Sequence, residues 1–407
     1  MTGSENRAAG AGRSWSFAAL LASLAMLSPF SIDMYLPAFP AITAEFAASP
    51  LAVQQTLSIY LFMYAAMMLW HGALSDALGR RPIILAGLAL YGIATLGCAI
   101  AGNIGSLWLF RALQGMSAGT GVVIGRAVIR DRFQGAEAQR LMSQMMMVFG
   151  IAPALAPVVG GVLLDTLGWR AIVWVLLVWV LATLAWTAHS LPETLPPSQR
   201  QPLHPRSLWR NYKAVLSRAD FLLLAMMPAF NFSAFFLYVA VAPSFLIGHL
   251  GVPATGFAWL FGPLIVGVML GASLSGRVAG RWAPMKTINV GYAFMFGAVA
   301  GNVLISAFAP PGVVWNVAPL MVYTLGSSLA MPSITLLLLD LFPTMRGLVS
   351  SLQGCLQFAL SGFNAASIAP ALDASLLRMA AGMAMFTIAS YALWLAYQRR
   401  HRAALGG

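Results

Sequence analysis

Asp33 and Arg111 are ionisable residues that each lie inside a long apolar stretch of the sequence. A charged side chain in the middle of an apolar helix is costly unless it faces water or a partner, so such residues mark functional positions. A carboxylate can take up and release a proton, whereas a guanidinium stays charged. We therefore predict that Asp33 and Arg111 serve proton coupling or substrate binding, together with Gln114, which lies on the same helical face as Arg111.

Both residues also have a plainer interpretation. Pro37 and Pro40 follow Asp33 closely, so the helix could end early and leave Asp33 as the cap of an outer turn. Arg111 could be purely structural, bonded to backbone carbonyls of the first two helices. The sequence leaves these alternatives open, and it also leaves open whether Asp33 and Arg111 pair directly.

The composition indicates an integral membrane protein. Of 407 residues, 60% are hydrophobic and 8% are charged, against about 25% charged in a typical soluble domain. The formal net charge of +12 does not indicate nucleic-acid binding, because the cations fall in short segments between apolar runs. Cys98 and Cys355 have no metal or redox spacing and are expected to be free thiols. No metal, no cofactor and no enzymatic catalytic set is expected.

Apolar runs long enough to span a membrane occur twelve times, which predicts an all-α polytopic membrane protein. The predicted spans are 15–39, 51–74, 82–101, 106–129, 138–164, 169–190, 221–247, 255–278, 287–309, 313–339, 348–372 and 376–397. A longer polar segment divides them six plus six. We therefore expect an N-terminal six-helix bundle (1–191), a linker (192–218) and a C-terminal six-helix bundle (219–407), related as pseudo-repeats.

The positive charges predict the orientation. All but three of the 23 Lys and Arg residues lie in segments that share one side of the membrane; the exceptions are Arg111, Arg170 and Arg378. Positive residues are enriched on the cytoplasmic side, so both termini are predicted to be cytoplasmic. The run that begins at Trp15 is too long for a secretory signal and is read as a retained first helix.

The linker has two parts with different character. Its first part is proline-rich and polar and is predicted to be extended. Its second part places apolar residues at helical spacing opposite basic ones, which predicts an amphipathic helix on the anionic inner leaflet. The apolar set is Leu208, Trp209, Tyr212, Val215 and Leu216. A regulatory or partner-binding helix is the alternative.

A short charged segment, 70–82, separates the second and third apolar runs. Its pattern is Gly72-x-x-x-Asp76-x-x-Gly79-Arg80-Arg81, with Ala77 after the acid. The glycines permit a tight turn, and Asp76 and Arg80 are predicted to form an ion pair. We expect this segment to be a gating hinge at a membrane face. A shift of 201 residues places Gly79-Arg80 on Gly280-Arg281, but Arg277 falls where Asp76 lies, so the second copy is expected to carry less gating chemistry.

The fifth run contains paired prolines and glycines. These residues are Gly150, Pro153, Pro157, Gly160 and Gly161. This pattern predicts a bent helix with a smooth face for close packing.

Aromatic and amide side chains of the second half, together with Tyr35, suit a cavity wall for flat, weakly polar ligands. The residues are Tyr35, Asn231, Phe232, Phe235, Tyr238, Gln353 and Gln357. Packing or hydrogen bonding between helices is the plainer interpretation of each.

The 70–82 pattern resembles the signature loop between helices 2 and 3 of the major facilitator superfamily, which usually has Arg or Lys where this chain has Ala77. The fifth run resembles the helix 5 motif of its antiporters, although Ala156 replaces the usual Gly. With Asp33-Met-Tyr-Leu-Pro37 and Arg126-Ala-Val-Ile-Arg-Asp131, these motifs resemble the bicyclomycin and chloramphenicol resistance (Bcr/CflA) branch of the drug:proton antiporters.

The resemblance implies a twelve-helix transporter that exports lipophilic drugs in exchange for protons. We expect it to be a monomer in the bacterial inner membrane. The resemblance also implies that Asp33, Arg111 and Asp76 match the acidic cavity residue, the helix 4 arginine and the gating aspartate. An exporter of a small metabolite, such as a sugar, nucleoside or amino-acid derivative, is the alternative within transport. A membrane-embedded sensor or enzyme is the remote one.

Overall fold

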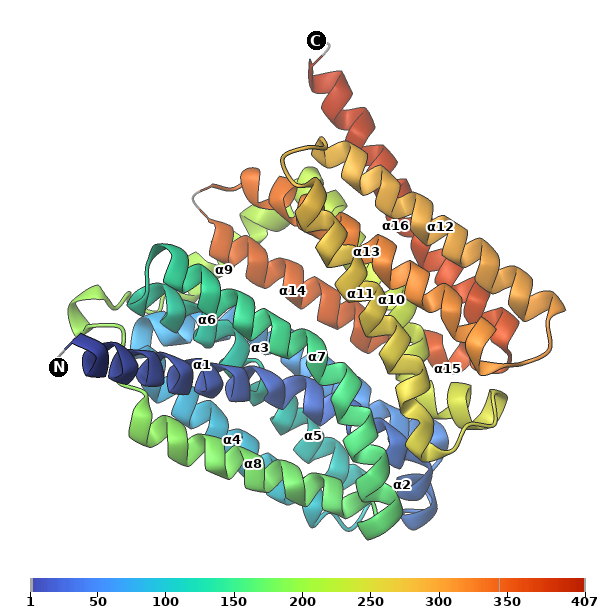
Figure 1. The fold of residues 1–407 in the computed structure, drawn as a ribbon, viewed down its shortest axis with the longest axis horizontal. Helices are drawn as coiled ribbons and strands as arrows, with labels where there is room; N and C mark the ends of the chain where they lie inside the picture. Colours follow the sequence, from blue (N-terminus) through green and yellow to red (C-terminus); the bar gives the residue numbers. More distant parts are fainter. Residues whose placement is uncertain (1–2, 344, 406–407) are drawn as a thin grey trace.

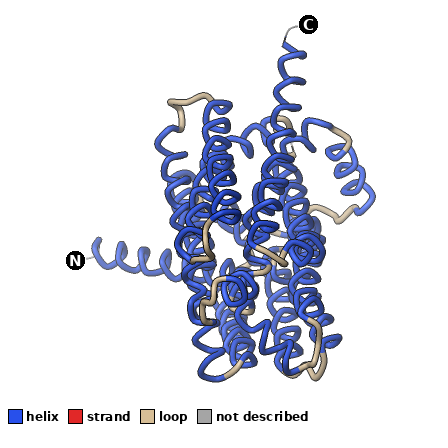
Figure 2. The backbone as a smooth tube through the Cα atoms, turned by 90° about the vertical axis from the view of Figure 1, so that its right-hand side faces the viewer, coloured by secondary structure: helices blue, strands red, loops and turns tan. Residues whose placement is uncertain are grey.

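The computed structural model describes residues 3–343 and 345–405. Within these residues the chain is a set of helices joined by short loops, without a strand (Figure 2). Figure 1 shows two groups of helices side by side, one from the first half of the chain and one from the second half. This arrangement confirms the prediction of an all-α protein built from two bundles.

The N-terminal bundle contains the helical segments α1 (Gly3–Asp33), η1 (Leu36–Ala38), α2 (Phe39–Glu45), α3 (Pro50–Leu78), α4 (Arg80–Ala99), α5 (Ile104–Ala118), α6 (Thr120–Arg132), α7 (Gly135–Leu167) and α8 (Trp169–Ser190). The linker carries η2 (Pro197–Gln199) and α9 (Pro205–Leu216). The C-terminal bundle contains α10 (Ala219–Ala240), η3 (Ser244–His249), η4 (Ala254–Phe257), α11 (Ala258–Val278), α12 (Pro284–Phe308), α13 (Val313–Asp340), α14 (Arg346–Phe363), η5 (Asn364–Ile368), α15 (Ala369–Leu372) and α16 (Leu376–Leu405).

Eleven segments of the described chain are long and apolar enough to cross a membrane. They correspond to all the predicted spans except the fifth, 138–164, which corresponds to the 33-residue helix α7. Large apolar side chains are exposed on the outside of the bundles, as at Ile93, Val178 and Phe308. In a soluble protein such a surface would promote association, whereas here it provides the lipid-facing side of the helices.

Two predicted helix ends were wrong, and prolines explain both. The first predicted span, 15–39, is interrupted because α1 ends at Asp33 and the span continues through η1 and α2 to Glu45. The helical bond to the carbonyl of Asp33 would come from residue 37, which is a proline without an N–H. In the same way α10 ends at Ala240, three residues before Pro243, and a π-helical turn, η3, follows.

The segment 70–82 is not the loop that we expected. Helix α3 continues to Leu78 and α4 begins at Arg80, so Gly79 alone forms the junction, with φ of +104°. This backbone conformation is accessible to glycine and strained for other residues. Gly280, between α11 and α12, also has a positive φ, of +73°. The two copies of the hinge therefore share a glycine with positive φ, although residues 279–283 separate α11 from α12 where Gly79 alone separates α3 from α4.

Helices α1 and α7 pack closely where the fifth run has its glycines. A Cβ atom added to Gly160 would overlap the backbone carbonyl of Met34. The small-residue face predicted for this helix is thus in backbone contact with the outer end of the first span. Close approach of this kind is the usual way in which membrane helices gain packing energy.

We predict that Gly160→Ala lowers the thermal stability of the purified protein. The added methyl group must displace the α1 backbone, and overpacking of this kind costs about 1–3 kcal/mol. Gly297→Ala is the matched control, because a Cβ at Gly297, inside α12, meets nothing within 4 Å. It should leave the unfolding temperature unchanged or raise it. Equal unfolding temperatures for the two variants would show that the α1–α7 contact adapts freely.

Candidate functional site

Arg111, on α5, lies inside the N-terminal bundle and is only 3% exposed. Its Nη1 donates hydrogen bonds to the carbonyl and the hydroxyl of Ser31 at 3.1 Å, and to Oε1 of Gln114 at 2.9 Å. The rings of Tyr35 and Tyr60 each lie 4.5 Å from its guanidinium carbon. This buried cation is therefore stabilised by neutral acceptors and by two aromatic faces.

Gln114 connects Arg111 to α4. Its Nε2 donates to Thr95 at 2.8 Å, and its Oε1 accepts the bond from Arg111. A small cavity adjoins this group, lined by Phe30, Ser31, Tyr35, Cys98, Arg111, Gln114, Ile172, Val173 and Leu176. Arg111 and Gln114, which were predicted to share one helical face, are thus bonded to each other. One bond of Arg111 goes to an α1 backbone carbonyl, as the structural alternative requires.

Asp33 is the last residue of α1, so the helix ends early as the plainer interpretation supposed, but its side chain is only 6% exposed and does not lie on the surface. Its side chain forms no ion pair with Arg111, and no hydrogen bond with the part of the chain that the structure describes. Residues two apart in a helix point about 200° apart. Since Ser31 faces Arg111, Asp33 lies on the face of α1 that is turned away from Arg111.

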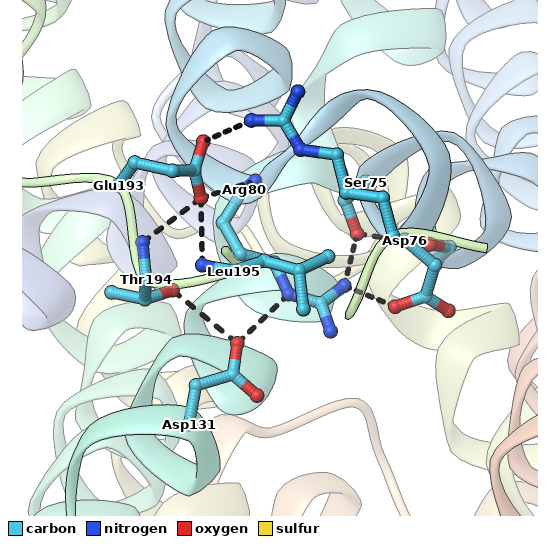
Figure 3. A network of polar contacts seen from close by, with 9 residues as sticks. Ser75, Asp76, Arg80, Asp131, Glu193, Thr194 and Leu195 are labelled. Atoms are coloured by element: carbon cyan, nitrogen blue, oxygen red, sulfur yellow. Dashed lines mark hydrogen bonds and ion pairs between the residues drawn. The ribbon is translucent and has the colours of Figure 1, made fainter. Parts of the chain in front are cut away.

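A second charged group surrounds Arg80 at the α3–α4 junction (Figure 3). The guanidinium of Arg80 lies 2.5 Å from Asp76 and 3.0 Å from Asp131, and it donates to the hydroxyl of Ser75 at 2.7 Å. The predicted Asp76–Arg80 ion pair is therefore confirmed. Asp131 is on α6, so one guanidinium ties the end of α3 to a third helix.

The linker takes part in the same network (Figure 3). Oε1 of Glu193 accepts hydrogen bonds from the backbone N–H groups of Arg80, Thr194 and Leu195 at 2.9–3.0 Å. A carboxylate at the first N–H groups of a helix is favourable because it meets unpaired donors and the positive end of the helix dipole. The first part of the linker is thus anchored to the start of α4.

Arg81 and α9 each form a further hydrogen bond at this end of the N-terminal bundle. Arg81 donates to the carbonyl of Ala188, near the end of α8, at 2.7 Å. Tyr212, on α9, donates to the carbonyl of Leu69 at 2.7 Å. Burial raises the pKa of Tyr212 to about 12, so its hydroxyl keeps the donated proton. Trp209 is exposed on the same helix.

The predicted residues of the fifth run lie on α7. Pro153 and Pro157 are inside the helix, and Gly160 faces α1 as described above. Gly161 is buried beside it. The side-chain surroundings of Gly150 lie outside the described residues. The Gly72 position on α3 has open space around it.

The predicted cavity-wall residues separate into two groups. Phe232 and Phe235 on α10 form an aromatic cluster with Phe236 and with Phe358 of α14. Tyr64 of α3 joins it, with its ring centroid 4.6 Å from that of Phe358. Aromatic side chains from both bundles therefore meet at one place.

The other predicted wall residues are inside the bundles or are bonded to their own helices. Tyr35 packs on Arg111, and Tyr238 accepts a hydrogen bond from Asn302 at 2.7 Å inside the C-terminal bundle. Asn231 is buried. Gln353 is 3.5 Å from the hydroxyl of Thr335, and the backbone carbonyl of Gln357 accepts from Ser361.

Sequence reasoning missed several members of these groups. Glu193 was read as part of an extended linker, and Asp131 only as part of a motif. Tyr60 and Tyr64 are four residues apart, so they share one face of α3, which is the signal that indicates a common role. One of these rings contacts Arg111 and the other contacts Phe358.

Comparison with known proteins gives a family and several relatives. The model of the Major Facilitator Superfamily matches residues 21–366. A bicyclomycin resistance protein homolog of Haemophilus influenzae is 29% identical and covers 87% of this chain and 88% of its own. A chloramphenicol resistance protein of Pseudomonas aeruginosa is 29% identical, over 86% of this chain and 84% of its own. The multidrug resistance protein MdtL of Escherichia coli is 30% identical over 62% of this chain and 63% of its own.

Solved structures of transporters share the fold at low sequence identity. A D-xylose–proton symporter superposes with a TM-score of 0.71 at 17% identity, covering 93% of this chain and 97% of its own. The human organic anion transporter MFSD10 gives 0.68 at 16% identity, covering 93% and 99%. The sequence match over most of the chain, the two bundles and the charged α3–α4 junction agree, and the chain belongs to the major facilitator superfamily.

Proposed function

We propose that this chain is a proton-coupled antiporter that exports lipophilic drugs, of the bicyclomycin or chloramphenicol kind, across the bacterial inner membrane. The resistance proteins among its relatives support the substrate class. The observation that carries the proposed coupling is Asp33, a buried carboxyl without a protein partner among the described residues. It is a membrane carboxyl that is available to bind a proton.

In this proposal Asp33 binds a proton from the outside and releases it to the cytoplasm, while the drug moves the other way. The membrane potential contributes about 2.3 kcal/mol per charge per 100 mV to this cycle. Arg111 is held by Ser31 and Gln114, inside the same bundle. It therefore shapes the N-terminal bundle beside Asp33 and does not neutralise Asp33 by direct contact.

The aromatic cluster between the bundles supplies the surface for a lipophilic drug. Tyr64, Phe358, Phe232 and Phe235 offer ring faces from both halves of the protein. Such faces bind flat, weakly polar molecules without demanding one hydrogen-bonding pattern. This property suits the export of several chemically different drugs.

The Arg80 network acts as the gate on the cytoplasmic side. Both termini and the linker lie on that side, the basic helix α9 rests on the anionic inner leaflet, and the protein works as a monomer. The excess of Lys and Arg in the segments assigned to that side supports this orientation. The two carboxylates on Arg80 hold α3 against α6, so their arrangement sets the balance between inward-open and outward-open states.

Transport into inverted membrane vesicles tests the proposal. Vesicles that contain the protein should accumulate labelled chloramphenicol when their interior is acidified, and accumulation should stop when an ionophore collapses the pH gradient. A panel of sugars, nucleosides and amino-acid derivatives should not be taken up. Gradient-driven uptake of a metabolite instead of the drug would support the alternative exporter, and no gradient-driven uptake of either would reject the proposal.

We predict that Asp33→Asn abolishes gradient-driven drug export and leaves the protein folded. The amide keeps the shape of the side chain but cannot carry the proton across. Asp165→Asn is the matched control, because Asp165 is exposed near the end of α7. Its transport rate in proteoliposomes should equal that of the parent protein, and full transport by Asp33→Asn would remove Asp33 from the coupling step.

We predict that Asp76→Asn lowers the transport rate at least about tenfold and changes the drug dissociation constant by less than about twofold. Loss of one charged partner of a mostly buried Arg80 is worth about 1.5–3 kcal/mol, which is enough for this change in rate. The control is Asp340→Asn, whose ion pair with Arg346 is solvent-exposed at both ends and contributes little. If the drug affinity of Asp76→Asn fell by as large a factor as its transport rate, Asp76 would be a binding residue. That result would contradict the gating role.

A further inference from the structure

One seam between the two bundles lies along α3 and α14 (Figure 1). The two helices run antiparallel, because later residues of α3 contact earlier residues of α14. Met68 faces Gly354, and Tyr64 contacts Phe358. Towards the start of α3, Nε2 of Gln55 donates a 2.8 Å hydrogen bond to the backbone carbonyl of Ala366. We call this end of the seam, which is opposite to the linker, the outer end.

The carbonyl of Ala366 lacks the usual donor of an α-helix. That donor would be the N–H of residue 370, four residues later, which is a proline. The backbone here is also irregular, since η5 is a π-helical turn in which Ala369 N–H bonds to the carbonyl of Asn364. Single π-helical turns inside membrane helices occur often at functional positions. The side-chain amide of Gln55 therefore supplies, from the other bundle, a donor to the Ala366 carbonyl in place of the N–H that Pro370 lacks.

The neighbouring amide makes a similar contact with another helix. Nε2 of Gln54 lies 3.5 Å from the carbonyl of Ala240, the last residue of α10. Pro243 and the π-helical turn η3 follow this residue, so the carbonyl lies at a second irregular helix end. Two adjacent glutamines of α3 thus reach carbonyls of two different helices of the C-terminal bundle.

We propose that Gln55 is a positioning residue of the outer gate: its bond to the Ala366 carbonyl, which Pro370 leaves without a helical donor, holds the outer end closed. The proposal rests on the transport function proposed above. Opening to the outside separates α3 from η5 and leaves this carbonyl without its donor, which favours the closed state. The Gln55–Ala366 hydrogen bond joins an amide to a carbonyl, and neither group ionises in this pH range. The bond therefore stays intact at every pH at which the proton site titrates.

The distance across the outer end tests this role without any transport measurement. Spin labels at Gly102→Cys and Pro311→Cys, in loops of the two bundles, report opening of the outer end in a Cys98→Ala, Cys355→Ala background. Gln55→Leu keeps the bulk and removes the donor. At a pH where the parent protein shows both distances, the ratio of long to short distances should rise by up to about tenfold, as expected for the loss of one partly buried hydrogen bond.

Pro370→Ala provides the decisive second variant. It returns an N–H to residue 370, which can donate to the Ala366 carbonyl from within the same helix. The hydrogen bond from Gln55 then contributes less to holding the outer end closed. This variant alone should raise the ratio of long to short distances, and adding Gln55→Leu to it should change the ratio by less than about twofold. Gln139→Leu, at an exposed amide of α7, is the matched control and should leave the ratio unchanged.

Two outcomes would overturn the proposal. The first is an unchanged ratio in folded Gln55→Leu. The second is an equal rise from Gln55→Leu with and without Pro370→Ala, which would show that the leucine acts by packing and not through the carbonyl. Failure of the proposed function is separate, because it would appear as absent drug uptake by the parent protein while the distance changes persist.

Discussion

In a hydrocarbon environment every backbone N–H and C=O group needs a partner inside the protein, and this constraint governs the irregular positions of the structure. Most groups are satisfied within the helices. Where prolines interrupt a helix, the freed carbonyl has to find another donor. Pro37 ends α1 at Asp33, and Pro370 leaves the carbonyl of Ala366 to the amide of Gln55. The same interruptions that cost helical bonds thus lie at the positions for which we propose functions.

Arg80 and Arg111 are both buried, and the free-energy cost of burying their charges is offset by different kinds of partner. Nη1 of Arg111 donates to neutral acceptors, and the rings of Tyr35 and Tyr60 lie against the guanidinium, all within the N-terminal bundle. These contacts fix the helices of one bundle relative to each other. Arg80 has two carboxylates, Asp76 and Asp131, near the membrane surface. Because the carboxylates of Asp76 and Asp131 are partly exposed, these ion pairs exchange partners at lower cost than fully buried ones, and the Arg80 network suits a moving part.

The contacts between the bundles are of a different kind from those within them. Across the seam they are aromatic rings, small residues and side-chain amides on backbone carbonyls, as at Tyr64, Phe358 and Gln55. Such contacts are directional enough to define a closed state and weak enough to break in each cycle. Rigid bundles joined by a weaker seam are the arrangement that alternating access requires.

The sequence by itself determined the spans, the two-bundle organisation and the isolated charges, because hydropathy and the cost of a buried charge act locally along the chain. It also predicted the Asp76–Arg80 pair, whose members are four residues apart on one helix. The tertiary structure decided what depends on helices that are distant in sequence. It placed Arg111 on Ser31, turned Asp33 away from both, and brought Glu193 to the start of α4. It also brought the side-chain amide of Gln55 within hydrogen-bonding distance of the Ala366 carbonyl. Which donor reaches that carbonyl depends on how the two bundles pack together.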